Sequence, residues 1–379
     1  MAEPRGSRLS GLMGFGQGAL PSVLSVVLSL LLCFLAIAVT RNDFALAVDA
    51  YLQMLWGGLG DLPAFGASGD WTRLTLPWGE SALKASILLL TGLSVSVAFA
   101  AGLFNIGAQG QLTVGAICAA VLGAKLHLPW GVHPVLCLLG AALMGGLYGL
   151  LPAILKLTRG VHEVISTIML NWVATSLVEN WLVVGPLRAQ GSGTGTDPIQ
   201  HTAVLPRLLG ELSRLHAGFP LALALAFGVW LWLSRTHYGF ETRAIGLGAE
   251  AARAAGIPTR RRTYQAMALS GALAGVAGAI LVLGTEYKFP NTLGAPYGFD
   301  GIAISLIGQN HPLGVAVTAL VFGVLRAGGT RMQLLGVHKS FPELIQGLAL
   351  LFVAGRKVWE VALARLRPKP APTTEAPRA

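Results

Sequence analysis

Two polar interruptions in an otherwise apolar sequence hold the residues that could do chemistry in this chain. In the first, Phe104 leads into Asn105, Gln109 and Gln111, so three amides fall between two apolar stretches with almost no turn. Inside a bilayer such amides are costly unless they face protein or a water-filled cavity. They could line a path for a polar, uncharged solute, or they could bond neighbouring helices together. The residue types alone leave both interpretations open.

The second interruption runs from Tyr297 through Asp300 to the Gln-Asn-His-Pro segment 309–312. Interrupted segments in the two halves of a transporter often flank the substrate route. Asn171, on an apolar stretch between the two interruptions, is a further polar candidate. The predicted substrate pathway therefore comprises Phe104, Asn105, Gln109, Gln111, Asn171 and Asp300.

The sequence has no motif for enzymatic or metal chemistry. It has no G-x-x-x-x-G-K-[ST] loop for ATP phosphates, and His162-Glu163 lacks the second histidine of an H-E-x-x-H zinc site. Cys33, Cys118 and Cys137 lie in apolar runs without metal-ligand spacing, so we expect small hydrophobic side chains and no disulfide framework. We predict no catalytic residue, no metal site and no cofactor in this chain.

The composition predicts that lipid surrounds the elements that carry these residues. Of 379 residues, 54% are hydrophobic and 12% are charged, with a mean hydropathy of +0.64. Soluble domains carry about 25% charged residues, so a disordered chain, a nucleic-acid module and most cytosolic enzymes are excluded. The net charge of +10 comes from basic residues between apolar stretches and at the two ends. That placement indicates contact with lipid headgroups and gives no support for a nucleic-acid partner.

We predict an all-α integral membrane protein with about ten transmembrane helices (eight to ten), some of them interrupted. A helix needs about 20 apolar residues to cross the hydrocarbon core. The predicted spans are 19–39, 81–101, 105–124, 132–155, 163–184, 217–234, 264–284, 300–308, 313–327 and 341–355.

Lysine and arginine are more frequent in the segments that would be cytoplasmic if the chain starts inside the cell and crosses ten times. This bias favours cytoplasmic N- and C-termini in a bacterial inner membrane. The predicted organisation is a cytoplasmic tail over 1–18, a transmembrane domain over 19–356 and a cytoplasmic tail over 357–379. The loop 235–263 would be cytoplasmic as well.

That loop contains a run from Arg243 to Pro258 that is rich in alanine, which favours a short helix. Gly256 and Pro258 would end the helix. A short helix held in the cytosol by flanking spans is a natural docking element for another protein. Alternatively, the loop is a connector that Arg260, Arg261 and Arg262 anchor at the cytoplasmic face. In the following span, the Gly271-x-x-x-Gly275 motif with Gly278 predicts a face where helices pack closely.

With these motifs, the sequence resembles the permease subunits of bacterial ABC importers for nucleosides and simple sugars, in the ribose-permease-related superfamily. The similarity covers roughly residues 80–355. The stretches that carry it are FNIGAQGQ at 104–111, GVHEVISTIMLN at 160–171, the loop at 238–257, SGALAG at 270–275 and GFDGIA at 298–303.

The resemblance implies a fold similar to the vitamin B12-type importer permease, with the stretch 243–257 as a coupling helix that docks on an ATP-binding cassette ATPase. The coupling residues would be Arg243, Gly246, Glu250, Ala251, Ala252 and Gly256. ATP and Mg would bind the ATPase. A second permease subunit and an extracytoplasmic solute-binding lipoprotein would complete the importer. The family pattern usually has Glu where this chain has Gln109, so a role that needs a carboxylate there is in question.

Two other functions remain open at this point. An ion-coupled secondary transporter would need carboxylates at membrane depth, and Glu163, Glu179 and Asp300 are the candidates. A permease for branched-chain amino acids would carry a zwitterion, and the sequence places no evident pair of charges to receive one.

Overall fold

The computed structural model describes residues 6–190, 193–210, 212–338 and 340–355 and is helical throughout, apart from loops and one isolated β-bridge between Arg207 and His216. In chain order, the helices are α1 (Gly6–Arg41), α2 (Phe44–Leu59), α3 (Leu62–Ser68), α4 (Thr72–Ala100), α5 (Ala108–Lys125), α6 (Val132–Arg159), α7 (Glu163–Leu177), η1 (Val178–Leu182), η2 (His201–Ala203), α8 (Gly218–Arg235), α9 (His237–Leu247), α10 (Ala249–Ala254), α11 (Thr259–Leu281), η3 (Val282–Glu286), α12 (Tyr297–Ile307), α13 (Pro312–Met332), η4 (Gln333–Leu335) and α14 (Phe341–Ala354).

Six helices in the described ranges are long and apolar enough to cross a membrane, which confirms the prediction of an all-helical, multi-pass membrane protein. They are Pro21–Arg41, Thr72–Ala100, Val132–Arg159, Gly218–Arg235, Thr259–Glu286 and Pro312–Leu335. Three shorter apolar helices, α2, α12 and α14, accompany them. The expectation of ten crossings goes beyond these six and stays a prediction.

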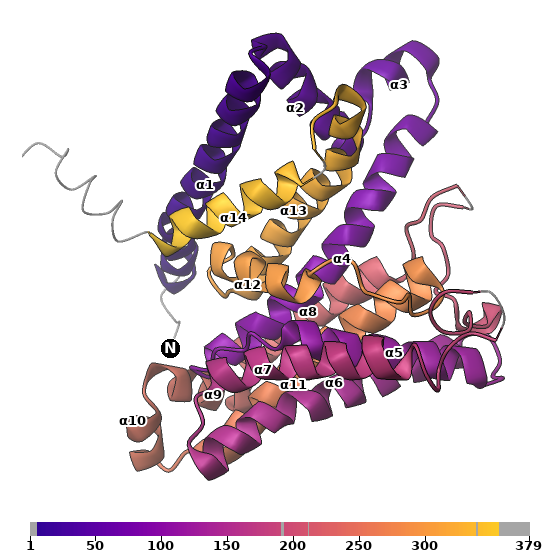
Figure 1. Ribbon diagram of the computed structural model, residues 1–379. Helices are drawn as coiled ribbons and strands as arrows, with labels where there is room; N and C mark the ends of the chain where they lie inside the picture. The colour runs from indigo at the N-terminus through magenta and orange to yellow at the C-terminus, as the bar shows by residue number, and fades with distance from the viewer. Residues whose placement is uncertain (1–5, 191–192, 211, 339, 356–379) are drawn as a thin grey trace, which may run out of the picture.

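The helices form two groups on either side of α4 (Figure 1). One group comprises α1, α2, α13 and α14, and the other comprises α5, α6, α7 and α11; the short helix α12 lies at the boundary between the groups. In an apolar stretch of 18 residues in α4, 89% of the residues are buried, whereas in the corresponding stretch of α1 the share is 22%. The helix α4 is therefore the central element, and α1 is peripheral.

Glycines bring α11 into backbone contact with its neighbours, as the Gly271-x-x-x-Gly275 motif predicts. A Cβ atom on Gly271 would collide with the carbonyl of Gly145 on α6, and one on Gly275 would collide with the carbonyl of Ala141. Gly278 meets the α5 backbone in the same way. Because no side chain separates the helices, α5, α6 and α11 pack as closely as helices can.

The bundle has two distinct ends. At one end, here called the α9/α10 end, Gly246 of α9 packs against the last residue of α4, Ala100. At the opposite end, Asp61 caps the N-terminus of α3 and forms a 3.0 Å ion pair with Arg331 of α13. Burial opposes ionisation of Asp61, but the bonds from the Ala64 N–H and from Arg331 outweigh it and hold the pKa of this carboxyl below its usual value.

The structure differs from the sequence-based spans mainly near the N-terminus. Residues 41–80, expected to be a connection, contain α2, α3 and the first two turns of α4. Asp43 explains the start of α2, because its side chain accepts a 3.0 Å hydrogen bond from the Leu46 N–H as an N-cap. Part of the expected N-terminal tail is helical, since α1 begins at Gly6, whereas residues 357–379 lie outside the described part.

Replacing a glycine at the α6–α11 contact is expected to destabilise the protein strongly. In a Gly275→Val variant the new side chain would collide with the α6 backbone, and overpacking of this kind costs about 1–3 kcal/mol or more. Gly228→Val on α8 is the matched control, because no atom lies within 4 Å of its added Cβ. Thermal unfolding of both variants in detergent tests this; equal midpoints would contradict the packing described.

Candidate functional site

Residues 101–107 connect α4 to α5 and have no helical structure. Phe104 of this connection packs edge-on against Phe99, with ring centroids 4.6 Å apart. Gln109 and Gln111, which belong to the predicted interruption and also to the predicted span 105–124, lie in the first turn of α5. The irregular backbone therefore needs partners for its own N–H and C=O groups.

Asn105 provides one set of these partners. It is fully buried, and its Oδ1 accepts a 2.9 Å hydrogen bond from the Gly107 N–H. Its Nδ2 donates to Gln111 Oε1 at 2.9 Å and to Ser270 Oγ on α11 at 2.7 Å. The side chain thus shapes the connection and joins it to α5 and α11.

Asn171 performs the corresponding task from α7. Its Oδ1 accepts a 2.8 Å hydrogen bond from the Gly110 N–H in the first turn of α5, and its Nδ2 donates to the Ile106 carbonyl at 2.8 Å. The side chain is buried. Asn105, Gln111 and Asn171 therefore converge on the connection, and the interpretation that these amides fix the bundle accounts for their contacts.

Gln109 connects the first interruption to the second. Its Oε1 accepts a 2.7 Å hydrogen bond from the Gly298 N–H in the first turn of α12. A Cβ on Gly298 would collide with the backbone of Gln109, so the two helix starts meet at van der Waals contact. Only the carbonyl oxygen of the Gln109 amide takes part in this bond, and a glutamate oxygen would accept the same N–H.

Asp300 lies two residues after Gly298, so it projects from the other side of α12 and faces a different helix. Its Oδ2 is 2.6 Å from Nη2 of Arg326 on α13, and the Gln346 amide of α14 donates to its Oδ1 at 3.2 Å. The side chains of Asp300 and Arg326 are 13% and 8% exposed, so this is a buried ion pair. The structure places Asp300 apart from the amide cluster.

The sequence reasoning missed Arg326. The predicted span 313–327 ends one residue after Arg326, and no role is predicted for this residue, whereas α13 continues to Met332 and buries the guanidinium. Lys84 on α4 donates to the Arg326 carbonyl at 3.1 Å. Basic residues inside apolar helices, with an acid in the neighbouring apolar stretch, were the available signal for such a pair.

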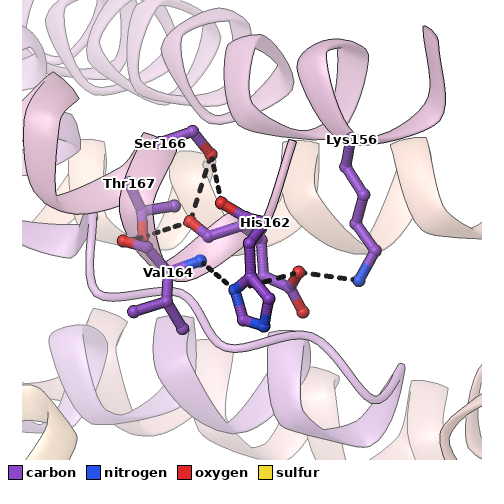
Figure 2. A network of polar contacts seen from close by, with 6 residues as sticks. Lys156, His162, Val164, Ser166 and Thr167 are labelled. Atoms are coloured by element: carbon purple, nitrogen blue, oxygen red, sulfur yellow. Dashed lines mark hydrogen bonds and ion pairs between the residues drawn. The ribbon is translucent and has the colours of Figure 1, made fainter. Parts of the chain in front are cut away.

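The start of α7 carries a polar network at the α9/α10 end, shown in Figure 2. Lys156 of α6 forms a 2.8 Å ion pair with Glu163, and His162 caps α7 by accepting the Val164 N–H at 3.3 Å. The Thr167 hydroxyl donates to the Glu163 carbonyl at 2.7 Å. The Glu163 carboxylate thus ties α7 to the end of α6.

The loop predicted as a coupling helix forms two helices. Gly248, with extended backbone, ends α9 and begins α10. The expected stop is confirmed: Gly256 adopts a φ of +82°, and the Ile257 N–H bonds back to the Ala252 carbonyl at 3.0 Å. Of the candidate coupling residues, Arg243 and Gly246 lie on α9; Glu250, Ala251 and Ala252 lie on α10.

A buried ion pair fixes α9 to the start of α11. Glu241 pairs with Arg262, and both side chains are less than 10% exposed. The Arg262 guanidinium also stacks on the Tyr238 ring at 4.3 Å and donates to Gln265 Oε1 at 2.6 Å. The arginines expected to anchor the loop thus have different roles, because Arg262 is inside and Arg260 and Arg261 are exposed.

The two helices enclose a groove of about 810 Å³ that opens to the outside of the molecule. Arg243, Leu247, Ala251 and Ile257 are among the residues that line it. Leu247 is 92% exposed, the highest value among the exposed large hydrophobic residues described. A rigid helix pair with an uncovered apolar side chain has the form of a docking surface.

Comparison with known proteins identifies the family of this chain. A family model described as the permease component of the branched-chain amino acid transport system matches residues 79–354. The chain belongs to this permease family. The match starts near the end of the first two turns of α4, and it ends at the last residue of α14.

Three relatives of the permease have names from nucleoside and sugar transport. The guanosine ABC transporter permease protein NupP of Bacillus subtilis is 38% identical over 77% of this chain and 84% of its own length. The glucose ABC transporter permease protein TsgB13 of Haloferax volcanii is 33% identical over 72% of this chain and 75% of its own. The nucleoside ABC transporter permease protein NupB of Lactococcus lactis is 29% identical over 76% and 82%. No solved structure matches the permease.

Removing the Asn171 amide is expected to destabilise the permease, since it leaves the Gly110 N–H and the Ile106 carbonyl buried without this partner. For Asn171→Leu we expect a loss of about 2 kcal/mol or more in the free energy of unfolding. Asn180→Leu is the matched control, because Asn180 is exposed on η1, the continuation of the same helix. Denaturation in detergent micelles measures both variants, and an equally stable Asn171→Leu variant would overturn the bonding role.

Proposed function

We propose that this chain is the membrane-spanning permease subunit of an ATP-driven ABC importer that carries a nucleoside or a simple sugar across the inner membrane. The observation that carries the proposal is the α9/α10 groove at one end of a bundle of apolar helices. The similarity to a guanosine ABC permease, at 38% identity, supports it. ATP and Mg would bind a separate ATP-binding cassette ATPase. The chain itself would supply the gated path.

The course of the chain supports ten passes with both termini on the α9/α10 side. The six long spans would be joined by α5, by α7 with η1, by α14 and by the half-crossing α12. The contact of Gly102 with Gly246 puts the turn after α4 at the α9/α10 end. The basic residues of that end favour the cytoplasm. An extracytoplasmic solute-binding lipoprotein would then deliver the solute at the opposite end, and a second permease would complete the path.

The pairing of the charges at the two interruptions favours a neutral solute. The polar groups around residues 101–107 are amides and hydroxyls, and the buried charges nearby are paired with each other. The relatives are named for guanosine, glucose and nucleosides, whereas the family description names branched-chain amino acids. A zwitterionic solute would need a separate pair of charges, so a nucleoside or sugar fits better.

The ion-coupled alternative has less support, because its three candidate carboxylates already have partners. Glu163 pairs with Lys156 and Asp300 pairs with Arg326. Glu179 accepts a 3.1 Å hydrogen bond from the Leu293 N–H. A coupling carboxylate must exchange its proton or ion during each cycle, and these contacts would oppose that exchange.

Transport in proteoliposomes tests the function. The chain is reconstituted with the ATPase, the second permease and the binding lipoprotein of the same importer, and uptake of labelled guanosine and glucose is measured with and without ATP. We expect accumulation only with ATP and with the ATPase present. Accumulation by this chain alone that collapses with an uncoupler would instead establish the ion-coupled alternative.

Leu247 provides a direct test of docking at the α9/α10 groove. Leu247→Asp should weaken binding of the ATPase at least about ten-fold, because an apolar anchor is lost from the centre of the interface. Leu334→Asp is the matched control at the opposite end, since Leu334 is also a leucine and is 81% exposed. Neither change should lower the unfolding temperature. Affinity of the purified subunits measures the effect; equal binding by both variants would refute docking at this groove.

A further inference from the structure

The short helix α12 is attached to the rest of the protein by two unlike sets of contacts. Towards α5, its first turn is held by the hydrogen bond from the Gly298 N–H to Gln109 Oε1, together with the close packing of the two backbones. Towards α13 and α14, it is held by the ion pair between Asp300 and Arg326 and by the bond from Gln346. In Figure 1, α12 lies at the boundary between the two groups of helices.

Arg326 is the residue at which four helices meet. Its guanidinium contacts Asp300 of α12 and stacks over the Tyr297 ring at 5.5 Å. The same nitrogen lies 3.9 Å from Glu343 of α14, and the Arg326 carbonyl accepts the Lys84 ammonium of α4. Through these contacts, α4, α12 and α14 are all attached to α13 at Arg326.

The two attachments of α12 differ in strength. A buried ion pair whose partner is removed leaves an uncompensated charge in a low-dielectric interior, which is among the most costly defects a protein can have. The attachment to α5 is a hydrogen bond between neutral groups with close backbone packing, and its separation leaves no charge uncompensated. If the two groups of helices move apart, we therefore expect the contact between Gln109 and Gly298 to open before the ion pair does.

We propose that Arg326 and Asp300 are positioning residues for translocation: they keep α12 fixed to α4, α13 and α14, so that the solute path opens at the Gln109–Gly298 contact. Neither residue binds the solute. This inference rests on the proposed function, because it assigns the moving boundary of the same path. It changes the role predicted for Asp300, from a lining residue to the partner of Arg326.

Distances between spin labels test which contact opens. Labels at Phe299 on α12, Leu344 on α14 and Met169 on α7 occupy exposed positions, in a chain whose three cysteines are replaced. In the assembled importer, the Phe299–Leu344 distance should stay constant between the nucleotide-free and the ATP-trapped states. The Phe299–Met169 distance should change. A shift of Phe299–Leu344, or no change in either distance in an importer that shows ATP-driven uptake, overturns the proposal.

Removing the ion pair supplies a second measurement that does not depend on the ATPase. In the full chain reconstituted alone, Arg326→Ala should broaden the Phe299–Leu344 distance distribution. Arg214→Ala is the matched control, because it also removes an arginine from an ion pair but leaves the contacts of α12 intact. Arg214 forms a partly exposed 3.5 Å pair with Glu80 of α4. An unchanged distribution in a folded Arg326→Ala variant overturns the proposal. If ATP-driven uptake is absent altogether, the proposed function fails, while this measurement still decides the role of Arg326.

Transport kinetics complete the test. Asp300→Ala and Arg326→Ala should each lower the maximal rate of uptake at least about ten-fold, with little change in the solute concentration for half-maximal uptake. The double variant should be no worse than either single variant, since the two residues act as a pair. A raised half-maximal concentration with an unchanged maximal rate would mean that Asp300 binds the solute, and would overturn the positioning role.

Discussion

The architecture depends on one constraint: each backbone N–H and C=O group buried in the bundle needs a partner within the protein. Helices meet this need by themselves, but the connection at 101–107 does not. Asn105 and Asn171 meet it there, with hydrogen bonds of 2.8–2.9 Å to the backbone of residues 106, 107 and 110. The irregular chain is stable in the bundle because these amides replace the water that a soluble loop would bind.

The same constraint explains why α5 and α12 start where they do. Each helix leaves its first N–H groups without intrahelical acceptors, and side chains from other segments accept two of them. Asn171 accepts the Gly110 N–H of α5, and Gln109 accepts the Gly298 N–H of α12. A chain of side-chain bonds thus runs from α7 through α5 to α12. It joins elements that are distant in the sequence, and it uses residues that a soluble protein would place on its surface.

Apolar run length and polar interruptions predicted much of the fold, because crossing a bilayer imposes a minimum length on a helix. They also identified the amide cluster and the glycine face of α11. They failed for α2, because an apolar helix of 16 residues is too short to register as a span. They failed for Arg326 as well. Its pairing with Asp300 depends on how α12 and α13 are placed against each other, and no local pattern encodes that distance.

The glycine contact between α6 and α11 has a consequence for how the gene can change. Every amino-acid replacement that one nucleotide change can make in a glycine codon adds a Cβ atom, and at Gly145, Gly271 and Gly275 that atom collides with the opposite backbone. No single amino-acid replacement at these three positions therefore avoids a collision. Mutations that persist must accumulate elsewhere, at positions such as Leu139, which faces outward on α6 and is 61% exposed.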